Sequence, residues 1–208
     1  MPPVSAHAPR RPPRLRRRGS WRRAEFAALD FETTGLDRER DAIVSFGVVP
    51  VRAGRALMGE SVHRLVEPAV PPSAESMRIH GLMPRDLDEG LALPQAAAAL
   101  GATLERRYVL AWYAGVEIDF LARLFGRRRS WIRRTVDVRQ MVIELEGLDQ
   151  DVRQSLSSAA EHYGVPVANP HEALDDAMVT AQLFLLIAAR LERRGLGSVG
   201  ALLGLTRA

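Results

Sequence analysis

The sequence contains no cysteine among its 208 residues. This absence excludes disulfide bonds, thiolate metal ligands and a cysteine nucleophile. Lysine is absent as well, so all 29 basic residues are arginines. The planar guanidinium group of arginine suits contacts with phosphate groups.

Long hydrophobic runs are also missing. The longest mainly apolar stretch, residues 181–189, already includes Gln182 and is far shorter than the roughly 18–20 residues that cross a bilayer. No apolar run follows the arginine-rich N-terminus, so a secretory signal pattern is not present. We therefore expect a cytoplasmic protein without a membrane partner.

Charge is distributed unevenly along the chain. Residues 1–23 carry eight arginines and no acidic residue. The whole chain has a formal net charge of +4, so residues 24–208 carry −4 once the +8 of the first segment is set aside. We expect the proline- and arginine-rich segment 1–23 to be disordered. It is either an arm that holds nucleic-acid phosphates or a solvated extension.

Hydrophobic patterning predicts one α/β domain over residues 24–195, with 196–208 as a short C-terminal extension. The 47% hydrophobic content is enough for one sizeable core. Short apolar segments predict strands at 26–32, 43–51, 56–66, 108–113 and 135–138. Helical patterns cover 94–106, 117–125, 155–163 and 172–194. Three strands followed by alternating helices and strands indicate a mixed sheet.

Two acidic residues end the first expected strand. Side chains alternate between the faces of a strand, so Asp30 and Glu32 project on the same side, about 7 Å apart along the chain. Paired carboxylates repel each other, and a bound Mg²⁺ or Mn²⁺ would remove that penalty. Two solvated acids at a strand end would explain the same pattern, so this pair alone does not identify a metal site.

A third acid, Asp119, directly follows Ile118 near the edge of the apolar stripe of the 117–125 helix. The alternative explanation is that an acid near the positive end of the helix dipole stabilises the helix. Glu117 fits that alternative better than Asp119 does.

His171 and Asp176 form the last candidate pair. On one continuous helix they would point about 140° apart. Pro170 disfavours helical geometry at Asn169, so the helix can begin just after the histidine. His171 would then lie on a loop beside a site that Asp176 helps to build. A polar loop residue and a capping acid are the simpler alternatives.

Taken together, these segments resemble the DEDD-type 3′→5′ exonuclease superfamily, in the DEDDh branch with histidine as the fifth residue. This branch includes bacterial proofreading subunits and RNA-trimming nucleases. The resemblance covers residues 24–195. It rests on the sequence LDFETTGL at 29–36, on IHGL at 79–82 and on HxALxDA at 171–177.

The second motif departs from the family. Members usually carry His-Asn-Ala before x-Phe-Asp, whereas this chain has Ala114, Gly115 and Val116 before Glu117 and Ile118. The acid of the motif is then Asp119. We expect the departure to affect rate and substrate preference more than metal binding.

The resemblance implies a ribonuclease H-like fold with a five-stranded mixed sheet flanked by helices. It also implies a metal-dependent exonuclease that releases nucleoside 5′-monophosphates from nucleic-acid 3′ ends, in DNA proofreading or repair. It implies a site in which two Mg²⁺ or Mn²⁺ ions are held by Asp30, Glu32, Asp119 and Asp176. It implies His171 as the general base. The substrate-binding residues that it implies are Thr33, Thr34, Gly35, Leu36 and His80.

Other functions remain open at this point. The chain could trim RNA 3′ ends, or be a catalytically weak nucleic-acid-binding module associated with a polymerase. The expected partners are single-stranded DNA or RNA 3′ ends, with a DNA polymerase subunit as a further candidate, and the oligomeric state stays open. The arginines at 127–129, 133 and 134 could form a phosphate track, but we favour a solvated loop anchored by Trp131.

Overall fold

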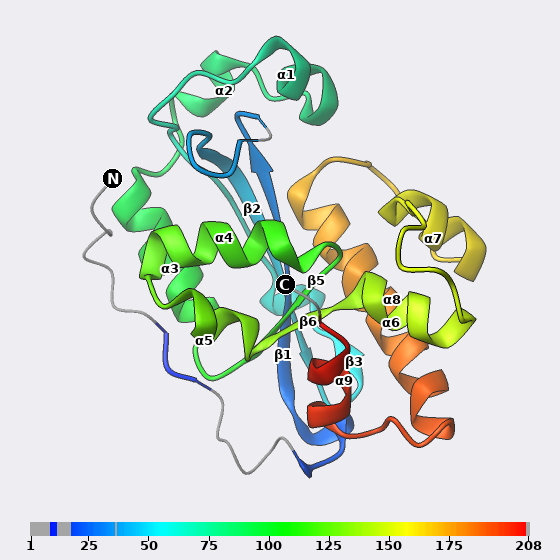
Figure 1. Cartoon of the computed structure of the whole chain (residues 1–208). Helices are drawn as coiled ribbons and strands as arrows, with labels where there is room; N and C mark the ends of the chain where they lie inside the picture. Colours follow the sequence, from blue (N-terminus) through cyan, green and yellow to red (C-terminus); the bar gives the residue numbers. More distant parts are fainter. Residues whose placement is uncertain (1–8, 12–17, 36, 207–208) are drawn as a thin grey trace.

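The computed structural model describes residues 9–11, 18–35 and 37–206. Within these residues, none of the helices combines the length and the apolar character needed to cross a membrane. One sheet runs through the centre of the molecule (Figure 1). Its strands are β1 (Glu25–Thr33), β2 (Ile43–Arg52), β3 (Arg55–Ala56), β4 (Val62–Leu65), β5 (Tyr108–Ala111) and β6 (Thr135–Asp137).

The sheet is mixed, as expected. Its order is β3-β2-β1-β5-β6, and β4 also pairs with β2. β2 is antiparallel to β1, whereas β5 and β6 continue the sheet in the direction of β1. β3 and β4 bond to different parts of β2, so six strands fill five positions. The strand expected at 56–66 is interrupted by a 3₁₀ helix, η3 (Met58–Glu60).

Helices cover both faces of the sheet (Figure 1). α3, α4 and α5 lie on one face, and α6, α7, α8 and α9 lie on the other. The helices are α1 (Ala74–His80), α2 (Pro84–Leu87), α3 (Leu93–Thr103), α4 (Ala114–Phe125), α5 (Arg128–Ile132), α6 (Val138–Glu146), α7 (Leu156–Tyr163), α8 (Ala173–Arg193) and α9 (Val199–Leu205).

The alternation of side chains along β1 produces the two layers. Phe26 and Ala28 point to the face covered by α8, whereas Ala27 and Leu29 point to the face covered by α3 and α4. All four side chains are buried, because the strand has helices on both sides. β1 is therefore the central strand, and residues at its end are held rigidly.

The packed body extends past both expected ends of the domain. At the N-terminal side, Trp21 begins a 3₁₀ helix, η2 (Trp21–Arg23), and its ring meets that of Phe184 edge-on at 5.6 Å. Disorder was the wrong expectation for this part of 1–23, because one buried indole supplies enough apolar contact to order it. Residues 1–8 and 12–17 of the arginine-rich segment lie outside the described residues.

At the C-terminal side, α9 lies in the expected C-terminal extension and packs on the body of the domain. Its Val199 and Leu202 are fully buried in the same core as α8. The Thr206 hydroxyl, just after α9, accepts a hydrogen bond from the Asp137 N–H at 3.0 Å. α9 is thereby tied to the end of β6.

The arginine-rich segment after α4 has a structural role at two of its positions. The buried Trp131 donates its indole N–H to the carbonyl of Gly126 at 3.1 Å, so it anchors the loop as predicted. Arg134 is also buried, and its guanidinium donates to the carbonyl of Leu104 at 2.6 Å. Arg134 therefore contributes nothing to a phosphate track.

Candidate active site

The site begins at the C-terminal end of β1. Asp30 and Glu32 are two residues apart on this strand, so their side chains lie on the same face. Across the ladder, Asp30 pairs with Gly47 of β2. The carboxyl ends of neighbouring parallel strands are where open α/β sheets bind ligands.

Gly47 allows the third acid to reach this place. A Cβ atom added to Gly47 would lie 2.1 Å from the carbonyl oxygen of Ala173 and 2.4 Å from the Cα of Leu174. Only glycine therefore lets the first turn of α8 lie directly against β2. That turn carries Asp176, so the close contact brings its carboxylate to Asp30 and Glu32.

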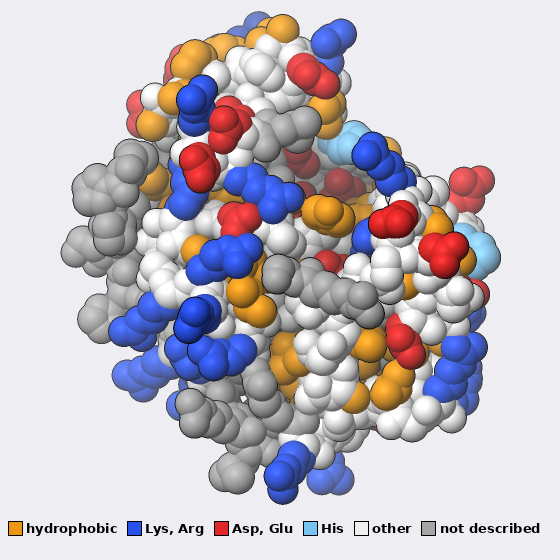
Figure 2. All heavy atoms as spheres, in the orientation of Figure 1, with side chains coloured by type: hydrophobic (Ala, Val, Ile, Leu, Met, Phe, Trp, Pro, Cys, Tyr) orange, Lys and Arg blue, Asp and Glu red, His pale blue; other side chains and the backbone are white. Residues whose placement is uncertain are grey.

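The three carboxylates form one cluster. One oxygen from each of Asp30, Glu32 and Asp176 lies within 4.8 Å of the others. Among the described residues, no arginine forms an ion pair with any of the three. Figure 2 shows acidic side chains at the bottom of a hollow between the α1–α2 segment and the rest of the molecule, with a histidine at its rim.

The electrostatics of the cluster favour bound positive charge. Burial, together with the charges of Asp176 and Glu172, raises the pKa of Glu32 to about 8. Burial also raises the pKa values of Asp30 and Asp176. Three close carboxylate oxygens without an ion pair match the hard ligands that divalent cations prefer. The residues present therefore fit a divalent-metal site.

His171 lies on the loop before α8, where the sequence predicted it. The helix begins at Ala173 with Glu172 as N-cap, so the histidine is outside it. His171 adopts a left-handed backbone conformation with φ of 64°. Its backbone N–H donates to Asp176 Oδ2 at 3.2 Å, which holds the exposed side chain beside the cluster.

Two side-chain hydrogen bonds stabilise the loop that was expected to bind substrate. Thr34 is buried, and its hydroxyl donates to Asp41 Oδ1 at 2.7 Å, so this side chain supports the loop. The Thr33 hydroxyl donates to the carbonyl of Gly35 at 2.7 Å. Leu36, the expected apolar wedge, lies outside the described residues.

His80 ends α1, on the segment that overhangs the site. Its Nδ1 atom accepts a hydrogen bond from the N–H of Leu82 at 3.0 Å. Burial lowers its pKa, and the charge of His171 acts in the same direction. The two histidines therefore lie near each other.

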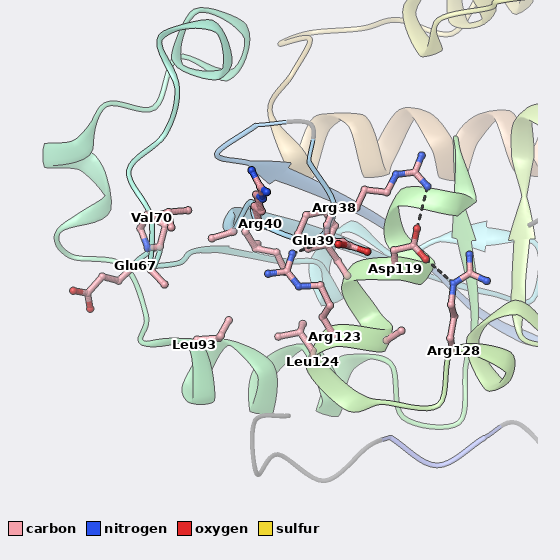
Figure 3. A pocket seen from close by; sticks show the side chains of 16 residues that line it. Arg38, Glu39, Arg40, Glu67, Val70, Leu93, Asp119, Arg123, Leu124 and Arg128 are labelled. Carbon is pink, nitrogen blue, oxygen red and sulfur yellow. Dashed lines mark hydrogen bonds and ion pairs between the residues drawn. The ribbon is translucent and has the colours of Figure 1, made fainter. Parts of the chain in front are cut away.

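Asp119, expected as the fourth carboxylate, does not belong to this cluster of three acids. Its two oxygens are held by Arg38 at 3.0 Å and by Arg128 at 2.7 Å (Figure 3). It lines a separate cavity of about 1100 Å³ on the outer side of α4. The reason is helical phase, because the apolar stripe that packs α4 on the sheet turns Asp119 away from it.

Glu117 is a buried acid that the sequence analysis did not include among its site residues. This side chain is only 5% exposed, and its Oε2 atom has no hydrogen-bond partner among the described residues. Burial is the main cause of the raised pKa of Asp30, and the charge of Glu117 raises it as well. Aligning the second motif two residues closer to the N-terminus would have pointed to Glu117. Ala114 then falls on the alanine of His-Asn-Ala, and Glu117 falls on the acid.

Comparisons with known proteins agree with this geometry. The DNA polymerase III PolC-type protein of Thermotoga petrophila is 30% identical over 183 residues, which are 85% of this chain and 13% of that protein. The DNA polymerase III subunit epsilon-like protein of Rhodobacter capsulatus is 28% identical over 184 residues, 86% of this chain and 26% of that protein. The chain thus spans only a small part of these relatives.

Solved structures share the fold. Exonuclease X in complex with 5′-overhanging duplex DNA has a TM-score of 0.68 at 19% identity, over 88% of this chain and 99% of that one. Escherichia coli exonuclease I in complex with a dT13 oligonucleotide has a TM-score of 0.66 at 18% identity, over 83% of this chain and 43% of that one. The ribonuclease H-like mixed sheet expected from the sequence is confirmed.

The family itself is established by a match over most of the chain. A family model described as exonuclease, of the RNase T type, matches residues 27–184. This range contains most of β1, all of α4 and the first turns of α8, and thus all three acids of the cluster. The family implies dependence on a divalent metal, which the carboxylate cluster fits. The chain therefore belongs to the RNase T exonuclease family.

Proposed function

We propose that the protein is a 3′→5′ exonuclease that uses two Mg²⁺ or Mn²⁺ ions to release nucleoside 5′-monophosphates from single-stranded 3′ ends. The observation that carries the proposal is the cluster of Asp30, Glu32 and Asp176, with ligand oxygens within 4.8 Å of one another. Family membership supports the reaction type, since phosphodiester hydrolysis is the chemistry of an exonuclease.

The three acids would hold the cations from one side of the hollow. Bound divalent cations supply a nucleophile at neutral pH and neutralise charge on the leaving oxygen. The protein keeps the acids in place through the central position of Asp30 and Glu32 in β1 and through the contact of α8 with Gly47. Asp176 is also oriented by the N–H of His171.

His171 would act as the general base. An imidazole titrates near neutral pH, so it can accept the proton of the attacking water. Its position supports this role, because the side chain is exposed on a loop whose backbone is bonded to Asp176. A loop position also lets the imidazole adjust when substrate arrives.

The terminal nucleotide would lie between the loop after β1 and the end of α1. Thr33, Gly35 and His80 would line this place, and the hydrogen bond of Thr34 to Asp41 would support it. Exonuclease I bound to an oligonucleotide supports a single-stranded substrate. The PolC-type relative supports DNA proofreading with a polymerase subunit as partner. RNA 3′ ends are the alternative substrate.

The test uses single-stranded DNA and RNA of the same sequence, labelled at the 5′ or the 3′ end, with Mg²⁺, Mn²⁺ or EDTA. We expect stepwise shortening from the 3′ end with release of 5′-monophosphates, and none in EDTA. Asp176→Asn should abolish the reaction. The neighbouring Asp175→Asn is the matched control, since Asp175 bonds to Asn169 outside the cluster. Binding without cleavage under every metal would refute the proposal and favour a binding module.

A further inference from the structure

Tyr113 is the most exposed large apolar side chain in the described part of the chain, at 52%. It lies two residues after β5 and is the N-cap residue of α4. When the second motif is aligned on Ala114, Trp112 and Tyr113 occupy the positions of its histidine and asparagine. The ring of Trp112 belongs to the core, so packing explains it. Packing does not explain an aromatic ring that stays in solvent at the next position.

The topology of the sheet places Tyr113 at the edge that carries the carboxylate cluster. β5 pairs with β1 in parallel, with Leu110 opposite Ala28. Two residues further in the same register, Trp112 comes beside Asp30, where both strands reach their carboxyl ends. Tyr113 is therefore a neighbour of the acids of β1 at this edge.

The ring of Tyr113 lies on the side of the sheet from which these acids project. The guanidinium of Arg139 is 5.7 Å from the centre of the ring. Arg139 belongs to the first turn of α6, which packs on the same face as α8. Asp30 points to this face too, because it alternates along β1 with Phe26 and Ala28.

Two contacts fix the ring before a ligand arrives. Arg139 is buried, and its Nη2 atom donates to the carbonyls of Gln150 and Val152, so the guanidinium is a rigid support. The Asp137 carboxylate accepts a hydrogen bond from the Ala114 N–H at 3.1 Å, which holds the backbone next to the ring. A cation covers one face of an aromatic ring and leaves the other face for a second flat group. A ring that is already positioned loses little freedom when it binds.

The strand order indicates which nucleotide can reach the ring. β1 lies between β2 and β5. The α1–α2 segment follows β4, on the β2 side, and the Ser76 hydroxyl of α1 donates to the Thr34 carbonyl at 2.9 Å. The terminal nucleotide was proposed to lie there, whereas Tyr113 lies on the β5 side. The scissile phosphate at the cluster has one nucleotide on each side, so the nucleotide next to Tyr113 is the penultimate one.

We propose that Tyr113 stacks on the base of the penultimate nucleotide, and that Arg139 is the positioning residue for its ring. This inference rests on the proposed function, since it takes the scissile phosphate to lie at the carboxylate cluster. Stacking on an aromatic ring tolerates every base, because each base has a π-face. Tyr113 would thus help to hold the strand without selecting its sequence.

The test removes the ring and the base separately. Wild type, Tyr113→Ala and Tyr113→Phe are assayed with Mn²⁺ for release of the first nucleotide from a single-stranded oligonucleotide. The same oligonucleotide is also used with one abasic nucleotide at the terminal, penultimate or third position. Tyr113→Ala should raise KM for the intact strand by about 5–100-fold with little change in kcat. Tyr113→Phe should match wild type, because it keeps the ring.

The abasic strands identify the base. A missing penultimate base should raise the KM of wild type by a similar factor and should have no further effect in Tyr113→Ala. Missing bases at the other two positions should have the same effect in both proteins. The calorimetric Mn²⁺ affinity and the unfolding temperature of Tyr113→Ala should equal those of wild type, because the ring is exposed and outside the carboxylate cluster.

The outcomes separate the two proposals. If wild type cleaves no strand with any divalent metal, the proposed function fails and the inference with it. If wild type cleaves and Tyr113→Ala keeps the wild-type KM, only the stacking role fails. It also fails if the missing penultimate base has the same effect in both proteins, or if Tyr113→Ala loses Mn²⁺ affinity.

Discussion

Gly47→Ala tests the link between backbone packing and the metal site. The added methyl group would lie 2.1 Å from the Ala173 carbonyl oxygen and 2.3 Å from its carbon. Ordinary contact distances begin near 3.4 Å. Because the neighbouring atoms are backbone, no side chain can rotate away, and the start of α8 has to move by about 1 Å.

That displacement should reach Asp176, which is three residues beyond Ala173 on the same rigid helix. Mg²⁺ requires oxygen ligands at about 2.0–2.1 Å in near-octahedral geometry, so a shift of that size removes a good ligand position. Misplacement of a catalytic group by about 1 Å costs roughly 10²-fold in rate. Overpacking should also lower the free energy of unfolding by about 1–3 kcal/mol.

The assay compares exonuclease rate, Mn²⁺ affinity and urea unfolding for wild type, Gly47→Ala and Gly204→Ala. Gly204 of α9 is the matched control, because a Cβ there has no atom within 4 Å. It should leave activity unchanged and stabilise the helix by about 0.5–1 kcal/mol. Wild-type rate and Mn²⁺ affinity in Gly47→Ala would refute the reasoning, since α8 would then not depend on this contact.

Three further predictions concern titration, catalysis and stability. Burial raises the pKa of Glu32 from 4.5 to about 8. The free energy of unfolding of the metal-free protein, measured by urea titration in EDTA, should therefore fall as the pH rises through that range. Glu32→Gln should make this free energy less dependent on pH. His171→Asn, which tolerates the left-handed backbone, should lower kcat about 10²–10⁴-fold and leave calorimetric Mn²⁺ affinity unchanged; near-normal kcat would remove the histidine from the mechanism. Trp21→Ala should lower the free energy of unfolding by about 3–5 kcal/mol, against little change for the exposed control Met58→Ala; equal effects would show that the N-terminal segment is not part of the core.

Local patterns were enough for the elements that build most of the site. The alternation along β1 placed Asp30 and Glu32 on one face before any packing was known. Pro170 correctly indicated that α8 begins after His171, because proline restricts the residue before it. These features depend only on neighbours along the chain.

Segments whose order comes from distant contacts were missed. Residues 18–23 looked too polar to fold, yet Trp21 is buried against Phe184 from the far end of the chain. α9 is short and has a weak pattern, but it packs on the core beside α8. Short elements gain most of their stability from tertiary packing, which a local pattern does not contain.

The sequence by itself determined the fold class, the family and three acids of the site, because strand alternation and helix boundaries are local properties. Only the tertiary structure showed that Glu117 is buried while Asp119 is paired with two arginines. Both are acids of the same helix, and the difference depends on which side of α4 packs on the sheet. That side is set by the summed burial of residues across the whole helix, so it appears only when the helix is docked.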